Sequence, residues 1–292
     1  MKTRKFIVVD YNFPMVTVVT LETSLGPGLV RTLSSIHSQS VEVNSILIDG
    51  SADEVLSKFV SAAFPKTNVI RQDPVGVYEA MNFALSFVPV EDSVLFLNSS
   101  DFFLGPNSLS NLIGSSDIQN EWLSGRTLGY KSALESFTLL GSAHFDPRLF
   151  RRGRQLLPHP ALLIPVLWLL DEGCFDPAFR IAADSDLSFR IFKRYGDPTI
   201  KPAIVSAHEM SGLSTIQTRN SMRELRKARF SHFPTSSVFG FLTNRFLSDS
   251  VNVVIEDETL KLERKIVEHY NDCRKSIRYP FCCIEVLELP LG

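Results

Sequence analysis

The sequence has few cysteines, almost no net charge and no long uninterrupted apolar run, and each feature argues against a class of protein. The chain of 292 residues has four cysteines, at positions 174, 273, 282 and 283, and no CxxC pair. Neither a disulfide framework nor a cysteine-based metal site is therefore expected, and a reducing compartment is the default. A formal net charge of −2 provides no general attraction for nucleic acid. The longest apolar stretch, residues 156–170, contains three prolines, whereas a membrane span needs about 20 consecutive apolar residues.

The remaining composition is that of an ordinary globular protein. Hydrophobic residues make up 44% of the chain and charged residues 21%, a balance that supports a packed core. The length allows one large α/β domain with an appendage. The first ten residues contain only a short apolar run, unlike a secretory signal peptide. We therefore expect a cytoplasmic protein that works in the cytosol or on the inner face of the cell membrane.

The N-terminal third of the chain alternates strand-like and helix-like segments. Apolar runs typical of buried parallel strands occur at residues 16–20, 45–48, 68–70 and 93–97. Helical spacing between them, as in residues 77–87, completes a series of β-α-β units, which predicts a parallel sheet with right-handed crossovers. Ligands bind outside the carboxyl ends of such strands. Three polar strand ends should therefore meet at one crevice, and they contain Thr20 and Glu22, Asp49, and Asn98 and Asp101.

The rest of the chain is less regular. Strands are expected at residues 122–130 and 136–140, and helices at residues 163–172 and 184–193. After residue 216, a basic helical stretch precedes a phenylalanine-rich segment, 230–246, and a charged helix, 256–270. The predicted organisation is a domain over residues 1–215, with a regular half at about 15–104 and a less regular half at about 105–215, followed by a helical appendage, 216–292.

The basic stretch of the tail has five Lys or Arg residues between 219 and 229, directly before the phenylalanines. A basic amphipathic helix beside aromatic anchors can lie in a membrane interface, where a lipid-linked acceptor would be presented. The alternative is that the phenylalanines pack under the α/β domain and the basic side chains are solvated.

Several polar residues after strands or at helix starts have two interpretations. Asp49 can accept a hydrogen bond from a base N–H or a ribose hydroxyl, or it can form a turn. Asp101 can bind a divalent cation that bridges a diphosphate, since hard cations choose oxygen ligands, or it can cap a loop. Gly76, Tyr78 and Asn82 belong to a helix start that suits a phosphate or sugar, or that only caps and packs the helix.

Four polar residues in the second half of the chain are further candidates. Asp184 and Asp186 lie at a predicted helix start, where one can cap the helix and the other can act as a general base. The capping role suits Asp186 better than Asp184. His159 is a polar residue in an apolar run, either a hydrogen-bonded core residue or a ligand. His208, together with the adjoining Glu209, follows a strand-like run and can belong to a further polar strand end.

Taken together and in this order, these runs resemble the family 2 glycosyltransferases, in particular bacterial enzymes that build capsular, exopolysaccharide or O-antigen repeat units. The resemblance covers roughly residues 15–215. It rests on VTVVT, SILIDGSAD, DPVGVYEAMNFAL, SVLFLNSSDFF, CFDPAFRIAADSDLSFRI and HEMSGLST. It implies the GT-A fold, an α/β architecture with a mostly parallel central sheet flanked by helices.

The resemblance also implies an activity and a donor site, with the nucleotide-binding half at about 15–104 and the acceptor half at about 105–215. The protein would transfer a sugar from a nucleotide-sugar donor to a saccharide or lipid-linked acceptor, with inversion, in polysaccharide biosynthesis. Thr20, Glu22 and Asp49 would contact the base and ribose. Asn98 and Asp101 would stand in the family's metal-binding acidic motif.

The remaining candidates take roles around the reaction itself. Asp184 would be the catalytic base that removes the acceptor proton. A divalent cation, Mn or Mg, would bind Asp101, with His208 as a further ligand. His159 and Asp186 would border the acceptor or the transferred sugar.

The sequence departs from the family's pattern in ways that leave other functions open. The acidic motif keeps one carboxylate, Asp101, and Ala183 stands where the family has the Glu of a Glu-Asp pair. A catalytically inactive sugar-binding or scaffolding domain is therefore one alternative. A sugar nucleotidyltransferase is another, but such enzymes carry a Gly-rich basic phosphate loop, and the GPG at 26–28 has only Arg31 nearby.

Overall fold

The structure is a computed structural model, and it describes residues 15–131, 136–210 and 218–234. The first part alternates strands and helices as expected: β1 (Val16–Glu22), α1 (Pro27–His37), β2 (Val43–Asp49), α2 (Val55–Ala63), β3 (Thr67–Arg71), α3 (Val77–Leu85) and β4 (Ser93–Phe96). These strands are parallel, with β1 between β2 and β4 and with β3 beside β2. The predicted parallel half of the sheet is confirmed.

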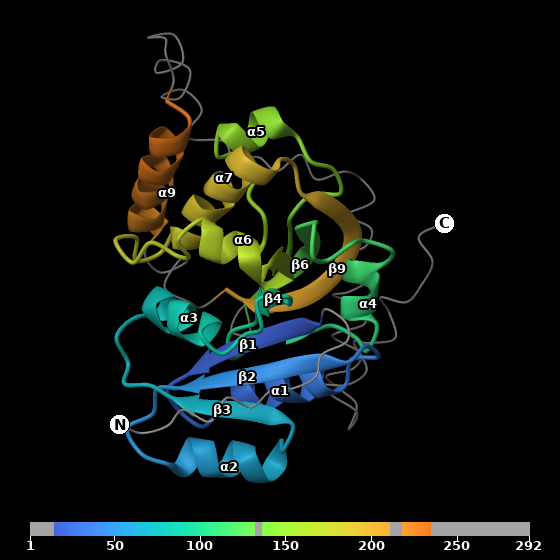
Figure 1. Cartoon of the computed structure of the whole chain (residues 1–292), viewed down its shortest axis with the longest axis vertical. Coiled ribbons are helices and arrows are strands. Elements are labelled where there is room, and N and C mark those ends of the chain that lie inside the picture. Colours follow the sequence, from blue (N-terminus) through green and yellow to red (C-terminus); the bar gives the residue numbers. More distant parts are fainter. Residues whose placement is uncertain (1–14, 132–135, 211–217, 235–292) are drawn as a thin grey trace.

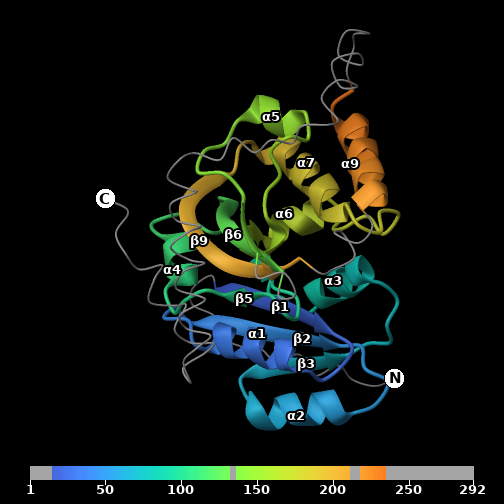
Figure 2. The ribbon, with the colours of Figure 1, turned by 180° about the vertical axis from the view of Figure 1, so that it is seen from behind.

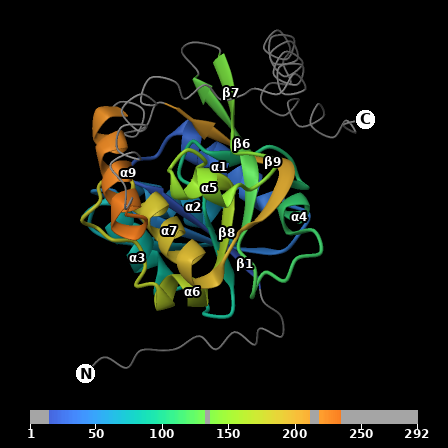
Figure 3. The same cartoon turned by 90° about the horizontal axis from the view of Figure 1, so that it is seen from above.

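The second part completes one mixed sheet. Its elements are β5 (Phe102–Phe103), α4 (Ser108–Ile113), β6 (Leu123–Lys131), β7 (Ser136–Leu140), α5 (Pro147–Arg151), the 3-10 turn η1 (His159–Ala161), β8 (Leu162–Pro165), α6 (Val166–Asp171), α7 (Ala183–Tyr195), β9 (Thr199–Glu209) and α9 (Thr218–His232). The nine strands have the order β3-β2-β1-β4-β8-β6-β9-β5, and β7 pairs with β6. The long strand β9 curves strongly (Figures 1 and 3).

Helices cover both faces of the sheet, which is why the first strands are apolar on both sides. Val18 packs in a core with α1, α2 and α4, whereas Val19 packs in a core with α3, α6 and α7. Accordingly, α1 lies behind the sheet in Figure 1 and in front of it in Figure 2. The predicted α/β architecture is confirmed.

The predicted helix at residues 163–172 is wrong in its first part. Residues 162–165 form β8, and only α6 is helical. Leu163 pairs with Leu123 of β6, and Ile164 pairs with Val94 of β4. The whole of β8 is buried, so its sequence lacks the alternation that distinguishes a strand from a helix.

The last described helix, α9, packs along α7 (Figure 1). Ala228 of α9 is fully buried in the core that contains α7. Just after α9, the ring of Phe233 contacts those of Phe189 and Phe192, with centroids 5.5 and 6.0 Å away. The predicted helix at 256–270 and the later phenylalanines lie outside the described residues, so the division at residue 216 stays a prediction. Among the described helices, none is both long and apolar enough to cross a membrane.

Candidate active site

The carboxyl ends of the first strands lie at one edge of the sheet. Glu22 of β1 is in register with Asp49 of β2, and the chain leaves β4 at Leu97, whose N–H donates to the carbonyl of Val19. The buried hydroxyl of Thr20 donates to the carbonyl of Leu97 at 2.9 Å. Thr20 therefore joins β1 to the segment after β4, while Glu22 is accessible at the edge.

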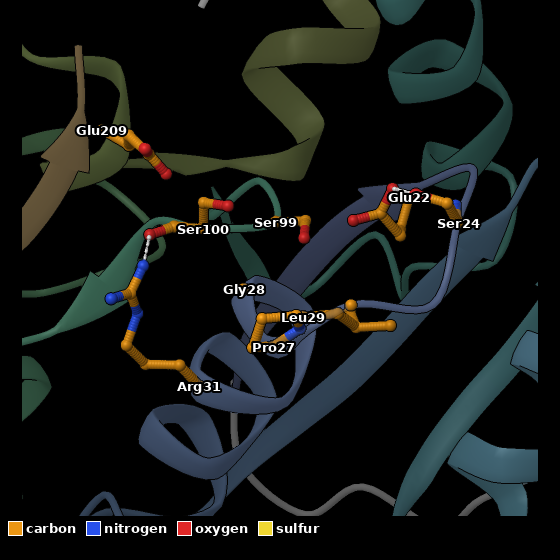
Figure 4. Close-up of a pocket in the computed structure, with 10 residues that line it drawn as sticks. Glu22, Ser24, Pro27, Gly28, Leu29, Arg31, Ser99, Ser100 and Glu209 are labelled. Carbon is orange, nitrogen blue, oxygen red and sulfur yellow. Dashed lines mark hydrogen bonds between the residues drawn. The ribbon is translucent and has the colours of Figure 1, made fainter. Parts of the chain in front are cut away.

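Two pockets open at this edge, and Glu22 lines both. The α1 pocket, about 380 Å³, lies between the start of α1 and the turn after β4, and its walls include Ser24, Gly28, Arg31, Ser99, Ser100 and Glu209 (Figure 4). The α3 pocket, about 200 Å³, has apolar walls from Leu21, Ile48, Val77 and Ala80, with Gln72 and Asp73 beside them. Together the two pockets have the size of a small-molecule site.

The α3 pocket depends on the backbone of Gly76, which caps α3 with φ 146° and ψ 159°. This region is open essentially to glycine alone. We expect Gly76→Ala to lower the free energy of unfolding by about 1–3 kcal/mol and to disturb the pocket. Urea denaturation measures the loss. Gly26→Ala is the matched control, because Gly26 caps α1 with an extended φ of −156° and open space around its Cβ; an equal loss in both variants would contradict a special role for Gly76.

The other two predicted site residues on α3, Tyr78 and Asn82, do not line the α3 pocket. The side-chain amide of Asn82 donates to the carbonyl of Phe175 at 2.8 Å and accepts from its N–H at 2.9 Å. Asn82 therefore holds the backbone of Phe175. The ring of Tyr78 is buried, and its hydroxyl donates to the carbonyl of Ile181 at 2.6 Å and lies 3.4 Å from Asp184 Oδ1.

A polar cluster forms where five segments meet: Tyr78 of α3, Asp101 after β4, His159 of η1, Asp184 of α7 and His208 of β9. The charges of Asp184 and Asp101 both act on the imidazole of His159, and the charge of Asp184 also acts on His208. These residues are far apart in the sequence, so the cluster is a product of the fold. It joins the residues predicted from the strand ends to those predicted from the second half of the chain.

His159 is a neutral member of this cluster. Its ring stacks on Phe96, with centroids 5.6 Å apart, and meets the edge of Phe175. Burial lowers the pKa of His159, although the charges of Asp184 and Asp101 oppose this effect. A neutral imidazole can both donate and accept a hydrogen bond. The structure thus places His159 beside the acidic residues as well as against the aromatic core.

Asp101 and His208 form a pair. Asp101 Oδ1 accepts hydrogen bonds from His208 Nδ1 at 3.0 Å and from the backbone N–H of Glu209 at 3.1 Å. Burial, the largest single influence, lowers the pKa of His208, but the hydrogen bond and the charge of Asp101, with Glu209 and Asp184, raise it by more, so the net pKa is above the ordinary value. The pair fastens the turn after β4 to the end of β9.

Asp184 lies in the first turn of α7, where the helix dipole favours a carboxylate. Its Oδ1 accepts the N–H of Ser185 at 2.8 Å and faces the Tyr78 hydroxyl. Burial, and then the charge of Asp184, raise the pKa of Tyr78, so Tyr78 stays a phenol. Asp184 is only half-buried, and a carboxylate oriented in this way can accept a proton from a bound hydroxyl.

Asp186 does not belong to the polar cluster around Asp184. Its carboxylate accepts Arg190 Nε at 2.9 Å and His232 Nε2 of α9 at 2.8 Å, and it is 5% exposed. Arg190 also donates to the carbonyls of Glu172 and Cys174. The structure therefore does not bring Asp186 to the cluster around Asp184; it makes Asp186 the link between α6, α7 and α9.

The turn at 98–101 does not fit a cation held by the protein. Asp101, its single acid, is 4% exposed, and its Oδ1 already accepts two hydrogen bonds. The side-chain oxygen of Asn98 is buried without a hydrogen-bond partner among the described residues, but it is neutral. Within the described parts of the chain, no group of three His, Cys, Asp or Glu side chains could hold a metal ion. The expected ligands Asp101 and His208 bind each other instead.

The sequence interpretation missed Arg31 and Glu209 as walls of the α1 pocket, and Phe96 and Phe175 as the aromatic support of His159. Arg31 lies on α1, and no local pattern separates it from a solvated helical arginine. Glu209 adjoins His208 at a polar strand end, so proximity in sequence was the signal available for it.

No family model matches the chain. Two curated proteins of Mycobacterium tuberculosis, from strains H37Rv and CDC 1551 and both described as an uncharacterized glycosyltransferase, are 28% identical over 184 residues. The match covers 61% of this chain and 68% of each relative. The chain thus has glycosyltransferases among its sequence relatives, which supports sugar transfer in general.

Solved structures show the fold. Staphylococcus aureus TarS matches with a TM-score of 0.57 and 14% identity, over 88% of this chain but 48% of TarS, so the chain spans about half of that protein. TarS 1-349 in complex with UDP-GlcNAc matches with a TM-score of 0.57 and 15% identity, over 87% of this chain and 78% of the other. The mannosyltransferase PcManGT from Pyrobaculum calidifontis, in complex with GDP-Man and Mn2+, matches with a TM-score of 0.54 and 16% identity. This match covers 75% of this chain and 64% of PcManGT. The predicted GT-A-type fold is confirmed.

Proposed function

We propose that the chain is an inverting glycosyltransferase that moves a sugar from a nucleotide-sugar donor to a hydroxyl of an acceptor. The observation that carries the proposal is the half-buried carboxylate of Asp184, oriented by the backbone N–H of Ser185 and acting with its charge on His159 and His208, on the described GT-A-type fold. The glycosyltransferases among the relatives support it.

The donor occupies the two pockets. The base lies against the apolar walls of the α3 pocket, and Glu22, shared by both pockets, accepts the ribose hydroxyls. Asp49 Oδ2 is buried and lies 3.8 Å from Arg71 Nε, but it accepts no hydrogen bond among the described residues, so we assign it to a base N–H. The diphosphate lies in the α1 pocket, where the N–H groups at the start of α1 favour an anion.

Transfer is a single displacement. The acceptor oxygen attacks the anomeric carbon on the face opposite the diphosphate, the new C–O bond forms, and the bond between that carbon and the phosphate oxygen breaks. Asp184 takes the proton of the attacking hydroxyl. The backbone N–H of Ser185 keeps the carboxylate in place, and the neutral His159 borders the transferred sugar. The residues at 98–101 do not fit a cation, so no step here uses one.

The acceptor in this proposal is a saccharide or a lipid-linked saccharide of a growing polysaccharide. Arg219, Arg223 and Arg226 of α9 are exposed and available to an anionic surface of the cytoplasmic membrane face. Lys227 and Arg229 instead contact aromatic rings of the protein, those of Phe179 and Phe230. Membrane association therefore rests on the three exposed arginines.

The test is a panel of UDP-, GDP- and dTDP-sugars, with release of nucleoside diphosphate as the readout. We expect the native protein to release the diphosphate from one donor, slowly with water and faster with an acceptor saccharide. Thermal shift with the same panel reports binding separately. Binding of a donor without any release, across a broad set of acceptors, would favour the inactive sugar-binding domain, and absence of binding would contradict both functions.

A further inference from the structure

The α1 pocket contains an arginine with no acidic partner. Within the described chain, no carboxylate lies within ion-pair distance of the Arg31 guanidinium, and its Nε is buried without a hydrogen-bond partner. Burying part of an uncompensated cation is costly. Arg31 is also one of the pocket's lining residues, so an anion bound there would supply the missing charge.

Arg31 is held rigidly at the turn after β4 (Figure 4). Its Nη2 donates to the carbonyl of Ser100 at 3.1 Å and to the hydroxyl of Tyr130 at 2.5 Å. The Tyr130 hydroxyl in turn donates to the same carbonyl at 2.9 Å. The guanidinium lies 4.6 Å from the ring centroid of Phe102. Three contacts of Arg31, with the Tyr130–Ser100 hydrogen bond behind them, therefore hold the charge in place before any ligand arrives.

The backbone of Ser100 makes this arrangement possible. Ser100 has φ 79°, a left-handed conformation that is uncommon for a residue with a side chain. Strain of this kind persists where the surroundings enforce it, often at ligand sites. Here the strained turn directs the Ser100 carbonyl toward Arg31 and Tyr130, while Ser99 and Ser100 themselves line the pocket.

We propose that Arg31 supplies the positive charge that holds the donor's diphosphate, so that this chain binds and uses its donor without a divalent cation. The inference rests on the proposed function. The turn at 98–101 lacks the acids that would hold a cation, because its single carboxylate, Asp101, is bound to His208 and to a backbone N–H. The planar guanidinium matches the geometry of phosphate oxygens. A fixed cation from α1 thus replaces a metal held at the turn.

Glu209 makes the proposal sharply testable, because it lines the same pocket with the opposite charge. If Arg31 alone neutralises the diphosphate, Glu209 repels the ligand, and Glu209→Gln tightens binding. If a cation bridges the diphosphate to the protein, Glu209 is an available oxygen ligand, and Glu209→Gln weakens binding. Only the backbone N–H of Glu209 bonds Asp101, so the substitution leaves that bond intact.

The experiment is calorimetric titration of the whole protein with UDP, GDP and dTDP, each in EDTA and in Mn2+. We expect one of the three to bind with nearly the same affinity in both buffers. Arg31→Gln should weaken it about 10- to 100-fold, the range for losing hydrogen bonds to a charged group, and Arg31→Lys by less. Arg194→Gln is the control, since Arg194 is exposed on α7 and pairs with Asp171. Melting temperatures verify that each variant is folded.

The outcomes separate the two proposals. Metal-independent binding that Arg31→Gln weakens and Glu209→Gln tightens supports the assignment of Arg31. Binding that requires Mn2+, or that is unchanged in folded Arg31→Gln, overturns it and leaves the proposed function standing. Absence of binding by all three diphosphates in both buffers contradicts the proposed function itself, and the role of Arg31 is rejected with it.

Discussion

Replacing Asp184 with asparagine is expected to abolish sugar transfer while donor affinity and stability remain near their native values. The asparagine keeps the size of the side chain and can still accept the hydrogen bond from the backbone N–H of Ser185 through its oxygen. It cannot take the proton of the attacking hydroxyl. Loss of a general base lowers turnover by about 10²- to 10⁴-fold. Steady-state rates with the donor found in the panel measure the loss.

Two further measurements distinguish loss of the general base from loss of donor binding or of folding. Calorimetric titration with the same donor should give similar affinity for the native protein and Asp184→Asn, because Asp184 does not line either pocket. The melting temperature should be close to native, because the side chain is half-buried and its helix-dipole contribution is small. If folded Asp184→Asn retained most of its turnover, Asp184 would lose the role of base.

Replacing Asp186 with asparagine is expected to destabilise the protein, although Asp186 lies only two positions further along α7. Asp186 carries the charge opposite Arg190 and bonds His232, with side-chain exposures of 6%, 17% and 15%. Breaking a buried ion pair by removing one partner costs about 3–5 kcal/mol. We expect about 3 kcal/mol, the lower end of that range, since Arg190 keeps its bonds to two backbone carbonyls. Urea denaturation measures the change in unfolding free energy.

The pair of variants forms one matched comparison. Asp184→Asn should lose turnover with little change in stability, and Asp186→Asn should lose stability with a native-like rate per folded molecule at a temperature well below its melting point. A stable Asp186→Asn that is catalytically dead would reverse this assignment. It would show that Asp186, despite its contacts with Arg190 and His232, takes part in the reaction.

Several site residues could be found from local patterns. Glu22 was predicted because it follows an apolar strand, and parallel strands end at a common edge. Asp184 was predicted because a helix start presents an acid after an apolar approach, and the helix begins there. Both positions follow from neighbouring residues and the regular geometry of strands and helices, whereas the roles of the two residues came from the family resemblance and stay predictions.

Other parts of the site could not be found in this way. Arg31 is an ordinary helical arginine until the turn at 98–101 and β6 place Ser100 and Tyr130 against it. Asp101 was a plausible metal ligand until β9 brought His208 to its carboxylate. The strand β8 looked helical because an apolar run buried on every side has no period. The environment of Arg31, the Asp101–His208 pair and the pairing of β8 all depend on contacts with residues that are distant in the sequence.

The sequence by itself determined the parallel β-α-β half of the fold and the polar strand ends, because periodicity and strand polarity are local properties of the chain. The sequence interpretation assigned both Asp184 and Asp186 to the active site, although two such positions on a helix lie about 200° apart. Only the tertiary structure decided which acid meets Tyr78 and which meets Arg190 and His232. The physical reason is that α7 packs against α6 and α9, with its apolar residues in the core that also contains α3, and this packing sets the rotation of the helix about its axis.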